Sequence, residues 1–260
     1  MTAPSIQHGN FDSLAVDYAQ YRPGYAPSIV SAVLSLVGRP AHEVDAVDIG
    51  AGTGIWTRML AAQDLRSVTA IEPSDQMRRC GLLTSQNQNI AWRRGTAEET
   101  GLPPRASDLV SMASSFHWAH FDKATSEFQR ILRPGGRFVA LWNPRMIELN
   151  PLAVEIEREI ARLNPAVKRV SSGRSGLTDK LTDMLWATPG FDDVVYLEAR
   201  HVAAQTAEQY LGAWRSVNDL RVQLGPDLFN RFLEFVERRT AGLAQIETTY
   251  LTRAWSVRRT

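Results

Sequence analysis

The chain has 260 residues and an apolar content of 44%, so it is long enough for one globular domain with additions. Its net charge of +1 gives no electrostatic reason to expect nucleic acid or an acidic membrane as a partner. The single cysteine, Cys80, excludes an intrachain disulfide and favours a reducing compartment. The sequence shows neither a bilayer-spanning apolar run nor a signal-peptide core, and we therefore expect a cytoplasmic protein.

Strands and helices are predicted to alternate through the first part of the chain. A helix is expected over residues 28–37, with Pro27 near its first turn. Further helices are predicted at 55–62, 75–83 and 121–132, and strands at 44–49, 67–71, 90–93, 109–113 and 137–142. Alternation with short links favours an α/β fold, a Rossmann-like doubly wound sheet with helices on both faces.

The pattern changes after residue 142. Helices are predicted at 151–163, 207–219 and 226–241, a polar loop at 168–179, and strands at 193–200 and 246–257. We expect a single domain over residues 1–260, in which helical cap elements cover the carboxyl ends of the strands, where ligands bind in such sheets. The expected core is about 40–143, 191–202 and 243–260, and the expected cap is about 1–38, 144–190 and 203–242.

The most informative stretch is Val47-Asp48-Ile49-Gly50-Ala51-Gly52-Thr53-Gly54, an apolar run that ends in an acid and three alternate glycines. Glycine permits a positive φ and lets a ligand lie against the backbone. A second apolar strand ends in Glu72, about 20 residues further on, the distance at which a carboxylate meets a ribose diol in doubly wound folds.

Two cofactors compete for this loop. The dinucleotide fingerprint is G-x-G-x-x-G/A, whereas this chain has Ile55 at the last position and its third glycine one residue early. Asp48 would repel a pyrophosphate and would tolerate a cationic sulfonium. The loop therefore favours S-adenosylmethionine over NAD.

On these residues the chain resembles the class I S-adenosylmethionine-dependent methyltransferases, specifically the small-molecule, methyltransferase type 11-like group. Further segments match the family in the same order: Phe11-Asp12, Tyr18, Tyr21-Arg22-Pro23, Glu72-Pro73-Ser74, Gly95-Thr96-Ala97-Glu98 and Leu132-Arg133-Pro134-Gly135-Gly136. The resemblance covers most of residues 10–145. It implies S-adenosylmethionine as cofactor and a mostly parallel seven-stranded sheet with an antiparallel last strand.

The resemblance also implies roles for individual residues. Glu72 would accept hydrogen bonds from the ribose, Thr96 and Ala97 would border the adenine, and Arg22 would suit the cofactor's carboxylate. The implied cofactor-binding residues are Asp48, Gly50, Ala51, Gly52, Gly54, Glu72, Pro73, Met77, Thr96, Ala97, Ser114, Tyr18, Tyr21 and Arg22. Each has a structural alternative: Asp48 caps the turn, Glu72 is a solvated strand end, Tyr18 and Tyr21 pack a helix, Arg22 pairs with a surface acid, and Met77 lies in the core.

His117 is the candidate general base, because it follows the fourth predicted strand and imidazole titrates near neutral pH. The alternative is a structural histidine that shapes the loop. Four tryptophans are candidates for an apolar acceptor pocket, with ordinary packing as the alternative: Trp118, Trp142, Trp186 and Trp214. The histidines and the cysteine show no metal-ligand spacing, so no metal is expected.

The leading hypothesis is methyl transfer to a small organic acceptor, with oxygen favoured over nitrogen or carbon. Ser114-Ser115-Phe116-His117 stands where enzymes that methylate base amines or glutamine often carry Asn/Asp-Pro-Pro-aromatic, which disfavours nucleic-acid targets. The alternatives are an NAD-dependent oxidoreductase and a non-catalytic cofactor-binding protein on the same fold. The sequence leaves the acceptor and the oligomeric state open.

Overall fold

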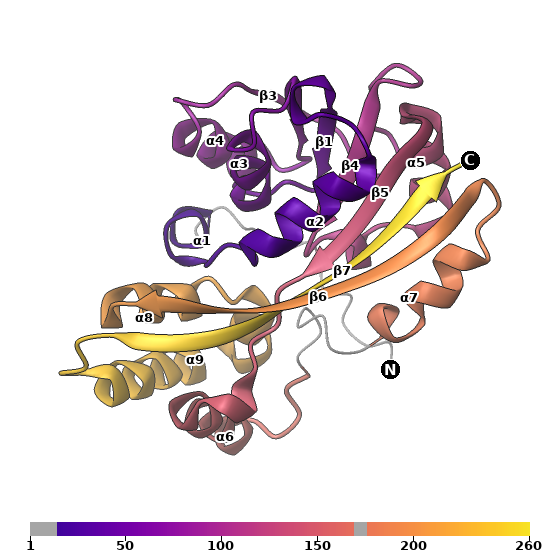
Figure 1. The fold of residues 1–260 in the computed structure, drawn as a ribbon. Coiled ribbons are helices and arrows are strands. Elements are labelled where there is room, and N and C mark those ends of the chain that lie inside the picture. Colours follow the sequence, from indigo (N-terminus) through magenta and orange to yellow (C-terminus); the bar gives the residue numbers. More distant parts are fainter. Residues whose placement is uncertain (1–14, 169–175) are drawn as a thin grey trace.

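The computed structural model describes residues 15–168 and 176–260 (Figure 1). Its centre is a seven-stranded sheet in the order β3-β2-β1-β4-β5-β7-β6. The strands are β1 (Asp45–Ile49), β2 (Ser67–Ile71), β3 (Ile90–Arg93), β4 (Ser107–Ala113), β5 (Leu132–Trp142), β6 (Phe191–Gln205) and β7 (Ile246–Arg259). Neighbours from β3 to β5 pair in parallel, and β7 is antiparallel to both β5 and β6. The predicted fold class, with its antiparallel last strand, is confirmed.

Helices cover both faces of the sheet because the central strands are apolar on both sides. The helices are α1 (Ala15–Tyr21), α2 (Pro27–Val37), α3 (Ile55–Ala61), α4 (Asp75–Thr84), α5 (Phe121–Ile131), α6 (Pro151–Leu163), α7 (Leu177–Trp186), α8 (Ala207–Arg215) and α9 (Asn218–Thr240). One face packs against α2 and α3, and the other against α5 and α7. In the described ranges no helix is both long and apolar enough to cross a membrane.

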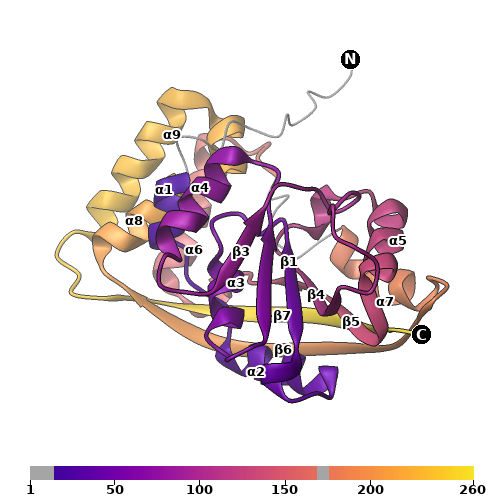
Figure 2. The same cartoon turned by 90° about the horizontal axis from the view of Figure 1, so that it is seen from above.

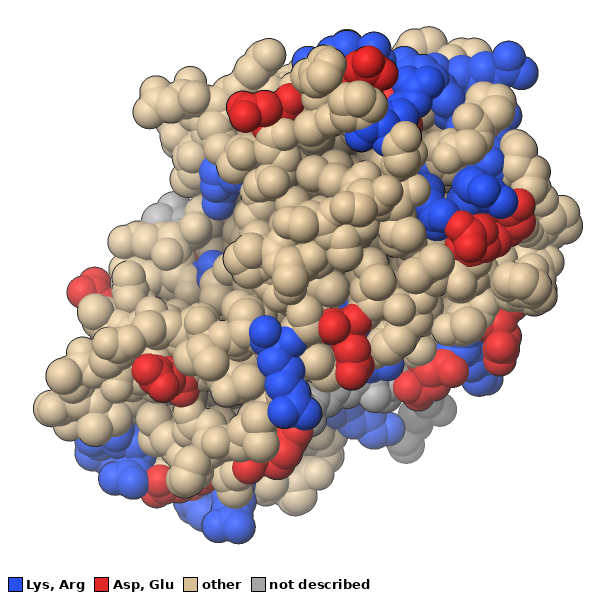
Figure 3. Space-filling model, in the orientation of Figure 1, with Lys and Arg blue, Asp and Glu red and all other residues tan. Residues whose placement is uncertain are grey.

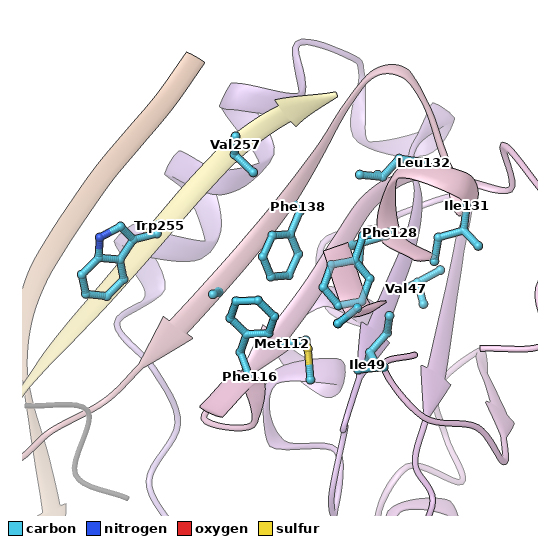
Figure 4. Close-up of a cluster of buried hydrophobic side chains, with 14 of the residues drawn as sticks. Val47, Ile49, Met112, Phe116, Phe128, Ile131, Leu132, Phe138, Trp255 and Val257 are labelled. Atoms are coloured by element: carbon cyan, nitrogen blue, oxygen red, sulfur yellow. The ribbon is translucent and has the colours of Figure 1, made fainter. Parts of the chain in front are cut away.

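A cluster of phenylalanines on the second face anchors the loop that follows β4 (Figure 4). Phe116 begins the short 3-10 helix η3 (Phe116–Trp118), and its ring centroid lies 5.0 Å from that of Phe138 on β5. Phe128 on α5 lies 4.5 Å from Phe138. Burial of Phe116 therefore holds the neighbouring residues of this loop at the carboxyl end of the sheet.

The long strands β6 and β7 carry the cap. Their pairing continues past Trp142, the last residue of β5, to the pair Gln205–Ile246. Figures 1 and 2 show this ribbon running beyond the other strands to α8 and α9. There α6, α8 and α9 share a separate apolar cluster that includes Ile156, Trp214 and Phe232. The cap is thus a second packing unit built on extended strands of the sheet.

The short helix α1 joins the two units by packing on α8. A Cβ added to Gly212 of α8 would lie 2.1 Å from the ring of Tyr21, so the absence of a side chain at Gly212 makes room for this ring. Gln205 Nε2 donates to the carbonyl oxygen of Tyr21 at 3.0 Å, and Arg22 Nε donates to Ser216 Oγ at 2.8 Å. The segment from Ala15 to Arg22 is therefore attached to the cap.

The structure differs from the expected cap division in two places. Helices α2 and α7 pack directly on the sheet, with Val33 and Leu181 completely buried, whereas the sequence places residues 1–38 and 144–190 in the cap. Helix α7 also lies partly within the predicted loop 168–179, of which residues 169–175 lie outside the described residues. The helix predicted at 207–219 ends at Arg215, and α9 starts at Asn218 and is kinked at Gly225.

Candidate active site

The glycine loop connects β1 to α3 at the carboxyl end of the sheet. Gly50, Gly52 and Gly54 have φ values of +63°, +58° and +82°, a region that L-residues with a Cβ rarely occupy. A Cβ on Gly50 would lie 2.8 Å from Ser115, so this glycine is also required by close packing. A Cβ on Gly52 would meet nothing within 4 Å and would project into open space beside the loop. The loop therefore leaves room for a ligand against the backbone of Gly52.

Glu72 stands directly after β2, beside this loop. It is 7% exposed, and its Oε2 accepts a hydrogen bond of 2.7 Å from the Gly52 N–H. Its Oε1 accepts one of 2.9 Å from the Ser74 N–H, at the N-cap of α4. Burial raises the pKa of Glu72, and the two backbone donors oppose that rise. The carboxylate predicted to meet the ribose thus lies at the loop, and its role stays a prediction.

Asp48, the last acid before the glycines, is completely buried under the loop. Its Oδ2 accepts a 2.6 Å hydrogen bond from the Thr57 hydroxyl on α3, and its Oδ1 accepts one of 3.1 Å from Ser111 on β4. Burial raises the pKa of Asp48 to about 7, against the effect of these hydroxyls. The described contacts of Asp48 join β1, α3 and β4, and its predicted role toward the cofactor stays a prediction.

The predicted adenine border lies where β2 and β3 end. Met77 on α4 and Ala97 are 6% exposed, whereas Pro73 and Thr96 are exposed. Thr96 Oγ1 accepts from the Glu99 N–H at 3.1 Å and holds the turn that follows β3. The structure thus provides apolar side chains next to the strand that bears Glu72, as the ribose and adenine of one cofactor would require.

Ser114 directly follows β4, and its backbone is strained. Its φ of +54° is unusual for a serine, and its Oγ lies 2.9 Å from the hydroxyl of Tyr25. The ring of Tyr25 is buried and lies edge-on to Trp56, with centroids 5.4 Å apart. Sequence reasoning missed Tyr25, since it lies between α1 and α2 in no periodic pattern. Its closeness to the Tyr21-Arg22-Pro23 motif was the one available signal.

The three cofactor-binding residues predicted near the N-terminus, Tyr18, Tyr21 and Arg22, have different contacts. Tyr21 packs against Gly212 and its hydroxyl donates to Glu208, so its described contacts are with α8. The Arg22 guanidinium lies 5.0 Å above the ring of Tyr18 and donates to the carbonyl and the hydroxyl of Ser216. The structure therefore brings Tyr18 and Arg22 together, and both Tyr21 and Arg22 contact α8 or its C-cap residue.

His117 is held between two tryptophans. The indole Nε1 of Trp142 donates to Nδ1 of His117 at 3.3 Å, and the ring of Trp118 is 4.7 Å away. Burial lowers the pKa of His117 to about 4, opposed in part by the charge of Asp219. The ring is therefore neutral at pH 7, with Nε2 buried and without a partner among the described residues.

Comparison with known proteins relates the part of the chain that contains this site to a protein family. Residues 47–140 match the sequence profile of the family described as "Methyltransferase domain". An uncharacterized methyltransferase of Mycobacterium tuberculosis is 36% identical over 136 residues, 52% of this chain and 53% of that protein, so the chain spans about half the length of this relative. A candidate type II methyltransferase from Anaeromyxobacter dehalogenans has a TM-score of 0.64 at 22% identity, over 91% of this chain and 97% of that one.

Residues 47–140 are a methyltransferase domain by this match, and the comparisons support a class I S-adenosylmethionine-dependent methyltransferase. The similarity extends beyond the sheet, since an uncharacterized methyltransferase of Schizosaccharomyces pombe is 22% identical over 95% of both chains. The family implies S-adenosylmethionine as cofactor, and the residues present fit it. The space over Gly52, the carboxylate of Glu72 and the apolar Met77 and Ala97 lie in one region at the carboxyl ends of β1 to β3.

The structure does not bring the four candidate tryptophans together on one side of a single site. Trp118 is 43% exposed and Trp142 is buried, both beside His117. Trp214 is buried in the cap. Trp186 is 69% exposed at the end of α7, close to the start of β6, and so lies at the other end of the sheet from the glycine loop. Three of the four thus remain candidates for the acceptor side.

Sequence reasoning missed Arg145, which lies where the chain passes from β5 into the cap. Its Nε donates to the Tyr250 hydroxyl at 3.3 Å, and its guanidinium lies 4.1 Å from the ring centroid of Trp214. The position of Arg145 three residues after the last core strand was the available signal. Among the described residues no three histidine, cysteine or acidic side chains gather as a metal site.

Proposed function

We propose that this chain transfers the methyl group of S-adenosylmethionine to an oxygen atom of a small organic acceptor. The observation that carries the proposal is the pairing of the open glycine loop with Glu72, whose carboxylate lies 2.7 Å from the Gly52 N–H. A diol-binding carboxylate at the end of β2 and a loop that admits a ligand at the end of β1 are the two parts that a nucleoside cofactor needs.

The chemistry needs alignment more than it needs acid or base groups. In an in-line displacement the acceptor atom bonds to the methyl carbon while the carbon–sulfur bond breaks, and sulfur loses its positive charge. The protein contributes by holding both molecules at short distance and excluding water. We propose that α1 and α8, joined through Tyr21 and Arg22, close over the donor; the contacts of Tyr21 with Gly212 and of Arg22 with Ser216 support this.

A small acceptor is supported by the surface as well as by the sequence. The net charge is +1, and the face in Figure 3 carries blue and red side chains interspersed around a broad uncharged area. A nucleic-acid target would favour an extended basic surface. Ser114 and His117 also occupy the positions after β4 at which amine-directed enzymes often carry their Asn/Asp-Pro-Pro motif.

An NAD-dependent oxidoreductase and a non-catalytic binding protein remain as alternatives to be tested. Asp48 and Ile55 disfavour the first, because a pyrophosphate would meet a buried acid and an incomplete fingerprint. Calorimetric titration with S-adenosylmethionine, S-adenosylhomocysteine and NAD distinguishes them. Micromolar binding of the first two with no binding of NAD supports the proposal, and binding of NAD alone would overturn it.

Glu72→Gln tests the assignment of the ribose. We expect its dissociation constant for S-adenosylhomocysteine to rise about 10- to 100-fold, since a hydrogen bond to a charged group contributes about 1.5–3 kcal/mol. Asp75→Asn is the matched control, because Asp75 is an exposed acid three residues away whose partner is Arg78. Near-native affinity in Glu72→Gln would show that this carboxylate does not hold the ribose.

A further inference from the structure

Strand β6 is the last strand at one edge of the sheet. In the sheet order its neighbour is β7, so within the described residues it is paired on one side only. Figure 1 shows β6 crossing the front of the molecule ahead of the other strands. An unpaired strand edge presents backbone N–H and C=O groups to which the strand of another chain can bind.

The hydrogen bonds of β7 on its other side establish which way its backbone groups point. The Leu251 N–H donates to the carbonyl of Pro144 at 2.9 Å. The carbonyl of Thr249 accepts from the Met146 N–H at 2.8 Å, on the same side of β7. Because successive residues of a strand point their backbone groups in opposite directions, the N–H and C=O of the intervening Tyr250 point toward β6.

The same alternation identifies the residues of β6 that face the open edge. His201 is paired with Tyr250, so its backbone groups point toward β7 and those of its two neighbours point outward. The exposed residues of β6 whose N–H and C=O point outward are Tyr196, Glu198, Arg200, Val202 and Ala204. Apart from the β6–β7 ladder, no backbone hydrogen bond between described residues reaches them.

This part of β6 lacks the features with which proteins usually protect a strand edge, namely proline, lysine and bulges. Residues 196–204 include neither proline nor lysine, and the shift in the β6–β7 register lies earlier, between Asp192 and Val195. Two large hydrophobic side chains are also exposed here, Tyr196 at 41% and Val202 at 57%. A regular edge with exposed apolar side chains favours pairing with another strand.

The side chains along this edge are complementary to a second copy of themselves. When two copies of a strand pair antiparallel about a two-fold axis, positions at equal distance from the axis face each other. An axis at Ala199 places Glu198 of each copy opposite Arg200 of the other, and Tyr196 opposite Val202. Opposite charges and apolar pairs stabilise such a ladder. The outward backbone groups of each of these residues also meet those of its partner.

The neighbouring registers do not have this complementarity. An axis one residue to either side, at Glu198 or at Arg200, places two like charges directly opposite each other, which destabilises an antiparallel pair. An axis two residues to either side leaves both charges opposite uncharged side chains. Within two residues of Ala199, therefore, only the axis at Ala199 itself pairs opposite charges.

We propose that two copies of this chain associate through β6, paired antiparallel about Ala199, so that their two sheets form one continuous sheet. Each copy contributes the same edge, so the assembly closes at two chains. The inference does not depend on methyl transfer, because β1, β4, β5 and β7 separate β6 from β2, the strand that precedes Glu72.

The first test is the oligomeric state of the full chain. Sedimentation velocity at chain concentrations from about 1 to 100 µM covers the range in which a weak interface dissociates. We expect a dimer at the upper end of this range that dissociates on dilution, because a short paired edge buries less area than a permanent interface. A monomer at every concentration would overturn the proposal.

Charge reversal tests which surface forms the dimer. Arg200→Glu would place two acids opposite each other, and Glu198→Arg two guanidinium groups, so each variant alone should raise the dimer dissociation constant at least about tenfold. An equimolar mixture of the two should form a heterodimer, since each supplies the charge that the other lacks. Arg231→Glu, at an exposed arginine of α9, is the matched control and should dimerise like the wild type.

Two results of this experiment would overturn the proposal. A dimer that persists unchanged in both Arg200→Glu and Glu198→Arg would be held by another surface. A mixture of the two that stays monomeric would show that the two charges do not face each other. Glu198 also accepts a 2.8 Å hydrogen bond from the Tyr196 hydroxyl, so thermal unfolding and titration with S-adenosylhomocysteine are measured first to identify misfolded protein.

A cysteine at the axis tests the register. Directly opposed residues of an antiparallel pair that share no backbone hydrogen bonds have Cα atoms about 4.5 Å apart, within the range of a disulfide. With Cys80→Ser as background, Ala199→Cys should give a covalent dimer on mild oxidation. Ala204→Cys is the matched control on the same strand, and its two copies should stay unlinked. Linkage of Ala204→Cys without linkage of Ala199→Cys would overturn the register.

Discussion

At the scale of single residues, Asp48 should make stability depend on pH. Burial raises its pKa from 3.8 to about 7 in the folded protein, so the folded state keeps a proton that the unfolded chain has released. The stability that this proton provides is present below about pH 4 and is lost as the pH rises towards 7. Each unit of pKa corresponds to about 1.4 kcal/mol, so the loss amounts to a few kcal/mol.

Asp48→Asn should remove this dependence, since an amide does not titrate. Urea unfolding of both proteins at pH 4.5, 6 and 7.5 would show the free energy of unfolding of the wild type falling more steeply than that of the variant. Parallel slopes would mean that Asp48 ionises in the folded state as it does in the unfolded chain.

What the sequence predicted at this scale depended on local spacing. The glycine loop and Glu72 could be placed because they end two adjacent parallel strands, whose carboxyl ends meet at one edge. Arg145 and Tyr25 could not, because their partners Tyr250 and Ser114 are 105 and 89 residues away along the chain. His117 was found, but its hydrogen-bond partner Trp142 lies 25 residues further along the chain, on β5.

At the scale of elements, the contact between α1 and α8 gives a prediction about closure. Gly212→Ala would place a methyl group 2.1 Å from the ring of Tyr21, so α1 must move away from α8. We expect faster proteolysis between residues 15 and 25 and weaker cofactor binding. In a Tyr21→Ala background the same change should have a much smaller additional effect. Additive effects in this double-mutant cycle would show that the two side chains do not compete for space.

The predicted helices and strands agree best where the period is clear, as in α6 and β2, whose bounds match the prediction. Tertiary contacts explain the main discrepancies. Helix α8 ends early because the carbonyl of Ser216 accepts a hydrogen bond from Arg22. Strand β6 continues past residue 200 because β7 pairs with it as far as Gln205. Neither partner can be read from a local window.

At the scale of the whole molecule, the cofactor should stabilise the fold. A ligand that binds only the native state adds about 2.7 kcal/mol at 100 times its dissociation constant, which corresponds to a rise in Tm of roughly 5 to 10 °C for a chain of this size. S-adenosylhomocysteine should produce this shift in differential scanning fluorimetry, NAD should not, and Glu72→Gln should reduce it at the same ligand concentration. An unchanged Tm at saturating S-adenosylhomocysteine would contradict native-state binding.

The pairing of Gln205 with Ile246 also bears on how such a protein can diversify. The segment that contains α8 and α9 connects the paired ends of β6 and β7, so it forms an insertion between two adjacent antiparallel strands. Changes in this one contiguous stretch of the chain would alter the cap and its contact with α1, while the strands that carry the glycine loop and Glu72 keep their pairing.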